Sequence, residues 1–153
     1  MGNKVKLLAV ASIGGHWIQL LRIINPNNAE VSVTYLSTHP KCEGMVEGQK
    51  FYTISDFSRW NFYKLIPAFF RALKIIQKER PNIVISTGAA PGLVVLLAAK
   101  FLGKKTIWVD SIANVQHLSL SGNIASKFVN QTFTQWESLK TPKILYAGNV
   151  LEQ

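Results

Sequence analysis

The fold class is indicated first by residues 5–16, Val5-Lys6-Leu7-Leu8-Ala9-Val10-Ala11-Ser12-Ile13-Gly14-Gly15-His16. Residues 5–11 form a short, mainly apolar run, which is typical of a buried β-strand. The glycine pair then allows a tight turn, and residues 16–24 carry apolar side chains at helical spacing, at Leu20, Ile23 and Ile24. A strand that passes through a glycine turn into a helix is the repeating unit of an α/β fold.

The same alternation continues along the chain. We expect further strands at residues 31–36, 51–54, 82–86, 106–109, 132–135 and 143–146, and further helices at residues 62–79, 91–102 and 124–130. Strands that alternate with helices predict a parallel sheet that is covered on both faces. The expected fold is therefore α/β, a Rossmann-like doubly wound parallel sheet, equivalent to the N-terminal half of a GT-B fold, and residues 1–153 are expected to form a single domain.

The composition narrows the function classes. The chain is 48% hydrophobic and 16% charged, which favours a globular domain over a disordered one. It carries 17 Lys and Arg residues against 8 Asp and Glu residues, and this excess predicts an anionic partner: nucleic acid, an acidic membrane or a phosphorylated substrate. A single cysteine, Cys42, cannot form an internal disulfide, so we expect a reducing compartment. No apolar run approaches the ~20 residues of a spanning helix, and none resembles a signal peptide.

The first loop, Ser12-Ile13-Gly14-Gly15-His16, is expected at the carboxyl end of a strand, where ligands bind in open α/β sheets. Glycines let the main chain approach a ligand, and the helix start offers free N–H groups that suit a phosphate. Trp17 and Gln19 break the dinucleotide pattern, and no acidic residue closes the second strand, so we expect no nicotinamide cofactor. A glycine turn needed only for packing is the alternative, but His16 at the loop's end favours a functional site.

Two later loops follow strands in the same way. In the loop at residues 86–92, Ser86 and Thr87 supply hydroxyls, and Gly88 is expected to face the same crevice as the first loop. In the loop at residues 110–115, Asp110 either caps a following turn or hydrogen-bonds a sugar hydroxyl.

Several short motifs, in this order and spacing, resemble one family. They are residues 12–16, Ser86-Thr87-Gly88 with Pro91-Gly92, Ala99-Lys100, Asp110-Ser111, Leu118-Ser119-Leu120-Ser121-Gly122 and Gln135-Trp136-Glu137. From about residue 5 to 150, the chain resembles the oligosaccharide and exopolysaccharide biosynthesis subunits that supply the N-terminal, acceptor-binding half of a split GT-B glycosyltransferase. The eukaryotic member anchors the enzyme that adds the second N-acetylglucosamine to the dolichol-linked precursor, and bacterial members serve capsule or exopolysaccharide assembly. The first loop also looks like that of the peptidoglycan enzyme that makes lipid II.

The resemblance implies a partner and a substrate. A separate chain, the C-terminal GT-B half, is expected to bind the nucleotide sugar, while this chain holds a lipid-diphosphate-linked sugar acceptor. The candidate acceptor- and phosphate-binding residues are Ser12, Gly14, Gly15, Ser86, Thr87, Gly88, Asp110 and Ser111. His16 is the candidate catalytic residue: histidine's ordinary pKa of ~6.5 suits a general base toward the acceptor hydroxyl, and hydrogen bonding to a phosphate is the alternative. We expect no cofactor and no metal.

Three features depart from the family pattern. Asn114 stands where an arginine is expected, which implies that this chain handles its substrate differently if that arginine contacts it. Ile13 stands where a small residue is commoner. The eukaryotic members have an N-terminal membrane span that is not seen here, so we expect peripheral attachment at the cytoplasmic face of the membrane.

The expected helix at residues 62–79 separates into two faces at a spacing of 3.6 residues. One stripe is assigned to the core and comprises Phe62, Leu65, Ile66, Phe69, Leu73 and Ile76. The opposite stripe mixes aromatic with basic residues, as an anionic membrane surface requires, and comprises Trp60, Tyr63, Lys64, Phe70, Arg71, Lys74 and Lys78. An ordinary solvated face is the alternative. No nucleic-acid-binding motif is present, so we expect no nucleic acid partner.

The sequence therefore predicts a subunit of a heteromeric glycosyltransferase, active with its partner. Two other classes remain open. One is a self-sufficient small nucleotide-binding transferase, and the other is a non-catalytic module that recruits a partner to the membrane.

Overall fold

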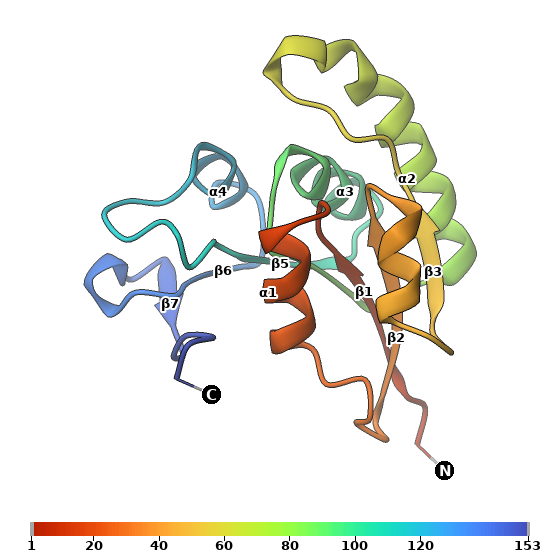
Figure 1. Ribbon diagram of the computed structural model, residues 1–153, viewed down its shortest axis with the longest axis horizontal. Coiled ribbons are helices and arrows are strands. Elements are labelled where there is room, and N and C mark those ends of the chain that lie inside the picture. Colours follow the sequence, from red (N-terminus) through yellow and green to blue (C-terminus); the bar gives the residue numbers. More distant parts are fainter. Residues whose placement is uncertain (1, 153) are drawn as a thin grey trace.

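The computed structural model describes residues 2–152, which contain a seven-stranded sheet (Figure 1). The strands are β1 (Val5–Val10), β2 (Val31–Ser37), β3 (Lys50–Thr53), β4 (Ile83–Ser86), β5 (Lys105–Val109), β6 (Gln131–Thr134) and β7 (Ile144–Tyr146). They run parallel in the order β3-β2-β1-β4-β5-β6-β7. The strand order reverses between β1 and β4, which is the switch point where doubly wound sheets bind ligands. The predicted fold class is confirmed.

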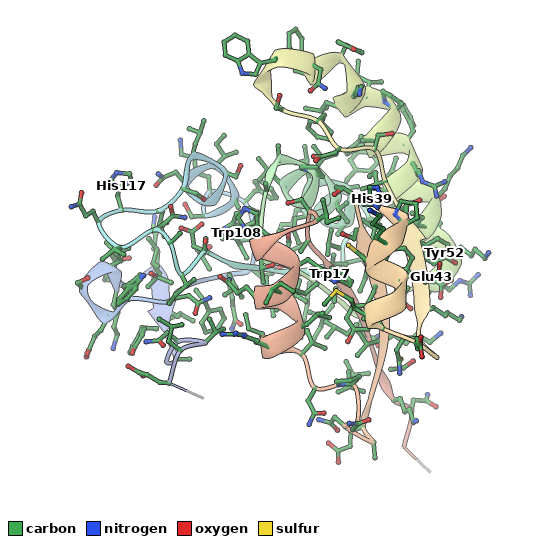
Figure 2. All side chains as sticks on the ribbon, viewed as in Figure 1. Trp17, His39, Glu43, Tyr52, Trp108 and His117 are labelled. Carbon is green, nitrogen blue, oxygen red and sulfur yellow. The ribbon has the colours of Figure 1, made fainter. Side chains whose placement is uncertain are left out.

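Helices cover both faces of this sheet (Figure 1). They are α1 (Gly15–Ile23), α2 (Leu65–Glu79), α3 (Ala90–Phe101) and α4 (Leu120–Ala125), with the 3₁₀ helices η1 (Pro40–Met45), η2 (Arg59–Lys64) and η3 (Glu137–Leu139). Alternate residues of β1 enter two different cores, as the period of a strand requires. Leu8 packs with α2, α3 and α4, and Ala9 packs with α1 and η1. Two buried indoles, Trp108 in the first core and Trp17 in the second, are the largest side chains of these layers (Figure 2).

The helix predicted at residues 62–79 is divided in the structure. Asn61 leaves the helical region, with φ −132° and ψ 42°, so that η2 is kinked inside, and η2 then continues into α2 through the helical Lys64 and Leu65. Ser58 fixes the start of η2, since its hydroxyl accepts from the Trp60 main-chain N–H at 3.3 Å and its own N–H donates to Asn61 Oδ1 at 2.6 Å. The helix predicted at residues 124–130 instead begins at Leu120, because Ser119 caps it by accepting from Gly122 N at 2.9 Å.

The core stripe predicted for α2 is only partly right. Ile76 is fully buried, while Phe62, Leu65 and Ile66 are 70%, 37% and 63% exposed. The buried face is formed by Ala68, Ala72, Ile75 and Ile76, with Phe69 and Leu73 at its edges. Alanines allow α2 and α3 to approach closely, and this turns the large apolar side chains of the first turns away from the core.

Glu79, at the end of α2, ties this helix to the edge strand β3. Its carboxylate accepts from Lys50 Nζ at 3.1 Å and from the Tyr52 hydroxyl. Lys78 Nζ lies 5.8 Å from the centre of the Tyr52 ring. Burial acts to raise the pKa of Glu79, but the hydrogen bonds from Tyr52 and Lys50 and the charges of Lys50 and Lys78 together hold this pKa below its ordinary value.

Candidate functional site

The structure brings the two glycine loops together at the switch point. They follow β1 and β4, which are neighbours in the sheet. The Ser12 N–H donates to the Gly88 carbonyl at 3.2 Å, and the Thr87 N–H donates to the Val10 carbonyl at 3.3 Å. The main chains of the two loops therefore form one continuous surface at the carboxyl edge of the sheet.

His16 is held in this surface by Thr87. The Nδ1 atom of the half-buried His16 ring lies 3.1 Å from the Thr87 carbonyl oxygen, and the Thr87 hydroxyl donates to the His16 carbonyl at 2.7 Å. Because a carbonyl oxygen only accepts, Nδ1 must carry a proton in this contact. In the neutral ring, Nε2 then has the free lone pair, and it has no hydrogen-bond partner within residues 2–152. His16 is thus oriented to accept a proton at Nε2.

Gly88 is required beside the His16 ring. A Cβ atom at this position would lie 2.6 Å from His16 Nδ1 and 2.8 Å from Cε1, closer than side-chain atoms approach each other. The φ of Gly88 is also +127°, which residues with side chains rarely adopt. Any side chain here would therefore displace the imidazole.

Two helices present free N-termini at the same surface. Neither α1 nor α3 has a side-chain cap or an acidic residue in its first turn. The first N–H groups of α1 and the positive ends of both helix dipoles remain available to an anion, whereas Pro91 in the first turn of α3 carries no N–H. Gly14 and Gly15 open onto space, because a Cβ atom at either position would meet nothing within 4 Å. A phosphate group fits the chemistry of this corner.

Ser86 and Thr87, predicted as ligand contacts, are not placed to touch a ligand. Both side chains are 0% exposed. The Ser86 hydroxyl accepts from the Gly88 N–H at 3.2 Å and lies directly beneath Gly92, where a Cβ would come within 2.1 Å of it. These hydroxyls hold the loop in shape. Ser12 is 7% exposed, and its hydroxyl has no hydrogen-bond partner in the described part of the chain, so it remains a candidate contact.

Asp110 is also occupied inside the protein. It is 1% exposed, and its carboxylate accepts from Trp108 Nε1 at 3.0 Å, from Ser119 N at 2.9 Å, from Ser119 Oγ at 2.6 Å and from Asn114 Nδ2 at 3.1 Å. Of the two roles considered for Asp110, the structural one fits this geometry, and a contact with a sugar hydroxyl does not. Asn114, at the position where an arginine was expected, donates a hydrogen bond to this carboxylate.

Two buried glutamines beside this loop were assigned no site role from the sequence, although Gln135 belongs to one of the family motifs. Gln19 Nε2 and Gln135 Nε2 both donate to the Asp110 carbonyl, at 3.1 Å and 3.3 Å. Gln19 follows His16 by one helical turn and sits on the buried side of α1, where a long polar side chain is unusual. A long polar side chain on the apolar side of this helix is the sequence signal that could have marked Gln19. Ser111 is half-buried in the loop, and its hydroxyl accepts from the Ala113 N–H at 3.2 Å.

The predicted membrane face is rich in exposed aromatic residues. Trp60, Tyr63 and Phe70 are 81%, 67% and 58% exposed. Together with other exposed side chains of η2, α2 and α3 they make up what we call the apolar patch: Trp60, Phe62, Tyr63, Ile66, Phe70, Leu97 and Phe101. Phe69 joins the two helices at its centre, with its ring 6.0 Å from that of Phe70 and 6.3 Å from that of Phe101. η2 and the start of α2 project beyond the rest of the fold (Figure 1).

The predicted basic residues of this face are distributed differently. Lys74 is exposed and Lys64 is half-buried. Arg71 Nε donates to the Thr53 carbonyl at 2.6 Å, and Lys78 lies over the Tyr52 ring, so both cations lean toward β3. Within residues 2–152, no helix is long and apolar enough to cross a membrane. The same residues contain no group of three or more His, Cys, Asp and Glu side chains that could hold a metal ion.

An apolar groove of about 280 Å³ lies on the α1 side of the sheet. Strand residues form its floor and the segment 147–150 forms one wall. The lining includes Ile23, Ile85, Ile107, Val109, Phe133 and Val150. Leu151, next in the chain, is 65% exposed.

Comparison with known proteins places this chain in a family. Residues 53–150 match the model of a family described as "Oligosaccharide biosynthesis protein Alg14 like". The chain belongs to this Alg14-like family. The resemblance read from the motifs is confirmed.

Curated relatives of this Alg14-like chain carry two kinds of name. It is similar to the "UDP-N-acetylglucosamine transferase subunit ALG14" of Yarrowia lipolytica, 33% identical over 89 residues, which is 53% of this chain and 41% of that protein. The mouse protein of the same name is 25% identical over 97% of this chain and 84% of its own length. A Geobacillus thermodenitrificans "UDP-N-acetylglucosamine--N-acetylmuramyl-(pentapeptide) pyrophosphoryl-undecaprenol N-acetylglucosamine transferase" is 24% identical over 100% of this chain. The chain spans about half the length of that transferase, 47%.

Solved structures agree on the fold. The Alg14-like chain superposes on Acinetobacter baumannii MurG with a TM-score of 0.79 and 16% identity, over 95% of this chain and 46% of MurG. A UDP-N-acetylglucosamine 2-epimerase superposes with a TM-score of 0.74 and 14% identity, over 96% of this chain and 49% of that chain.

Proposed function

We propose that this chain is the acceptor-binding subunit of a glycosyltransferase, which transfers a sugar from a nucleotide sugar to a lipid-diphosphate-linked acceptor. One observation carries the proposal: two glycine loops and two uncapped helix N-termini meet beside an oriented histidine. Relatives over most of the chain are named as a subunit of a UDP-N-acetylglucosamine transferase, which supports this class of reaction.

In this proposal the diphosphate of the acceptor lies against the open main chain of Gly14 and Gly15. Free N–H groups of α1 and the positive dipole ends of α1 and α3 offset its charge. His16 Nε2 takes the proton of the acceptor hydroxyl while that oxygen bonds to the anomeric carbon of the donor sugar, and the bond from that carbon to the nucleoside diphosphate breaks. The proton fixed on Nδ1 by Thr87 favours this role over donation to a phosphate from the neutral ring.

The nucleotide sugar is assigned to a second chain, the C-terminal half of a GT-B enzyme. The groove of about 280 Å³ beside Val150 supports a docking place for it, because its floor is apolar and Leu151 is exposed at its border. Exposed contiguous apolar surface of this kind marks interaction sites. The subunit name of the relatives also supports a partner.

Attachment to the cytoplasmic face of a membrane is assigned to the apolar patch. Trp60 and Phe62 on the projecting η2 have the exposure that insertion into the interfacial region needs. Lys64 and Lys74 lie on the same helical segment and attract anionic headgroups, and Arg71 and Lys78 add positive charge on its β3 side. A peripheral position would bring the acceptor diphosphate, which sits at the membrane surface, within reach of the glycine loops.

Acceptor binding is tested by adding charge to the first turn of α1. Gly15→Glu fits sterically, since a Cβ there meets nothing within 4 Å, but it places a carboxylate against the diphosphate. At ~5 Å and an effective dielectric constant of ~20 the repulsion is about 3 kcal/mol per unit charge, so the Kd for a lipid-diphosphate-linked sugar in detergent rises about 100-fold. Gly44→Glu is the matched control, because Gly44 is equally open and lies in η1. Equal Kd values for both variants and the parent would refute the assigned phosphate site.

A further inference from the structure

Gln135 joins the wall of the groove to the loop beside His16. This residue directly follows β6 and is 2% exposed. Its Nε2 donates to the Asp110 carbonyl at 3.3 Å, and its Oε1 accepts from the Val150 N–H at 3.0 Å. One side chain thus spans from the groove wall to the start of the loop 110–115.

Gln19 completes the connection from the other side. It is 4% exposed, lies on α1 and donates through Nε2 to the same Asp110 oxygen at 3.1 Å. Its Oε1 accepts from the Ile112 N–H at 3.0 Å. A single carbonyl oxygen therefore links the helix that carries His16, the loop 110–115 and the wall of the groove. Trp136 adds a further tie, since its Nε1 donates to the Ile112 carbonyl at 2.8 Å.

Both amides are satisfied at both ends, with the N–H side toward a carbonyl and the oxygen side toward a main-chain N–H. Burying an amide gains little net stability even when its hydrogen bonds are made, and apolar residues of the same shape serve a core equally well. What two such amides add is a fixed distance and direction between the three segments that they connect.

We propose that Gln135 is a positioning residue, through which a subunit docked on the groove sets the loop 110–115 for the acceptor. This inference rests on the proposed function. Val150 lines the groove and donates to Gln135, so a chain that packs there immobilises the segment 148–151 and, through Gln135, the Asp110 carbonyl. Ile112 is immobilised as well, because Gln19 and Trp136 hydrogen-bond to its main chain. Acceptor binding by this chain then depends on the docked subunit.

Amide hydrogen exchange of residues 110–115 tests the connection directly. It is measured for the chain alone and co-expressed with the C-terminal GT-B subunit from the same organism, in the parent and in Gln135→Met. This substitution keeps the length of the side chain and removes both hydrogen bonds. In the parent, complex formation slows exchange of this segment about 10-fold or more. In Gln135→Met the complex still forms, the slowing is lost, and the KM for the acceptor rises while the KM for the nucleotide sugar stays unchanged.

Two further variants separate positioning from general stability. Thr106→Val removes a buried hydrogen bond to Asn130 Oδ1 of 3.0 Å at the far end of β5, so it lowers stability but keeps the slowing of exchange. Gln135→Glu keeps an acceptor for Val150 N–H and loses the donor for Asp110, so it behaves like Gln135→Met at the loop and serves if that variant fails to fold. Equal slowing in the parent and in either Gln135 variant overturns the inference. If the parent complex transfers sugar but its residues 110–115 exchange no more slowly than in the chain alone, the inference is also overturned and the proposed function stands. If exchange slows but no sugar is transferred, the result counts against the proposed function alone.

Discussion

Adding one methyl group at Gly88 tests the role of His16 without changing the histidine. In Gly88→Ala the new Cβ would lie 2.6 Å from His16 Nδ1, whereas ordinary contact begins at 3.4 Å, so the ring has to retreat by about 0.8 Å. A displacement of ~1 Å in a catalytic group can cost ~100-fold in rate. We therefore expect kcat to fall about 100-fold in the reconstituted enzyme.

The same substitution also strains the main chain, and this effect needs its own control. A φ of +127° costs an alanine roughly 1–3 kcal/mol of folding free energy. Gly103 has a φ of +72° at the opposite edge of the sheet, and a Cβ there meets nothing within 4 Å. Gly103→Ala therefore carries comparable strain without touching His16.

Urea unfolding and steady-state transfer kinetics on both variants separate the two effects. Both are expected to lose similar unfolding free energy, and only Gly88→Ala is expected to lose kcat. A normal kcat in Gly88→Ala would show that the position of the His16 ring does not matter to the reaction. An equal loss of kcat in Gly103→Ala would assign the effect to strain.

Four further predictions follow from the same geometry. His16→Ala should lower kcat by ~100-fold or more with a modest change in acceptor KM; a change mainly in KM would make His16 a phosphate ligand instead. The double variant Trp60→Ala with Phe62→Ala should weaken binding to neutral and anionic vesicles by more than ~100-fold, since each exposed ring contributes up to about 3 kcal/mol on insertion. The quadruple Gln variant of Lys64, Arg71, Lys74 and Lys78 should weaken binding to anionic vesicles only. Flotation assays that show the reverse pattern would refute the apolar patch as the anchor. Leu151→Glu should prevent co-purification with the second subunit without lowering the melting temperature, and unchanged co-purification would move the interface elsewhere. Glu79→Gln should lower the free energy of unfolding by about 1 kcal/mol at neutral pH. Because the pKa of Glu79 is lowered in the folded state, its stabilisation is present above the ordinary value of 4.5 and is lost as pH falls through the folded pKa. A stability difference from the parent that persists in acid would refute the ion-pair contribution.

The sheet was predictable because its signals are local. Most strands are short runs rich in β-branched, aromatic or other apolar residues, and their predicted boundaries match the structure within about one residue. The buried face of α2 was not predictable from periodicity alone. Large apolar side chains at Phe62 and Ile66 satisfy the helical period, but the kink at Asn61 and the small Ala68 and Ala72 decide which side packs on α3.

The candidate site was also predictable in part. That the glycine loops after β1 and β4 would meet follows from strand order, which the alternation of elements implies. Which hydroxyls and carboxylates face a ligand does not follow, since burial of these side chains depends on residues far away in sequence, such as His16 for Thr87. Gln135 acts through main-chain atoms of two other segments, and no sequence pattern marks such a contact.

A three-way measurement of sugar transfer tests most directly whether this chain supplies the acceptor-binding half of a shared active site. Labelled nucleotide sugar and a lipid-diphosphate-linked acceptor are incubated with this chain alone, with the C-terminal GT-B subunit of the same organism alone, and with both co-expressed. Transfer by the pair and by neither chain alone is the result expected of an acceptor-binding subunit. Transfer by this chain alone would make it a self-sufficient enzyme, and undiminished transfer by the other protein alone would make it a module for recruitment; either result contradicts the assignment of the acceptor site to the loops around His16 in a shared active site.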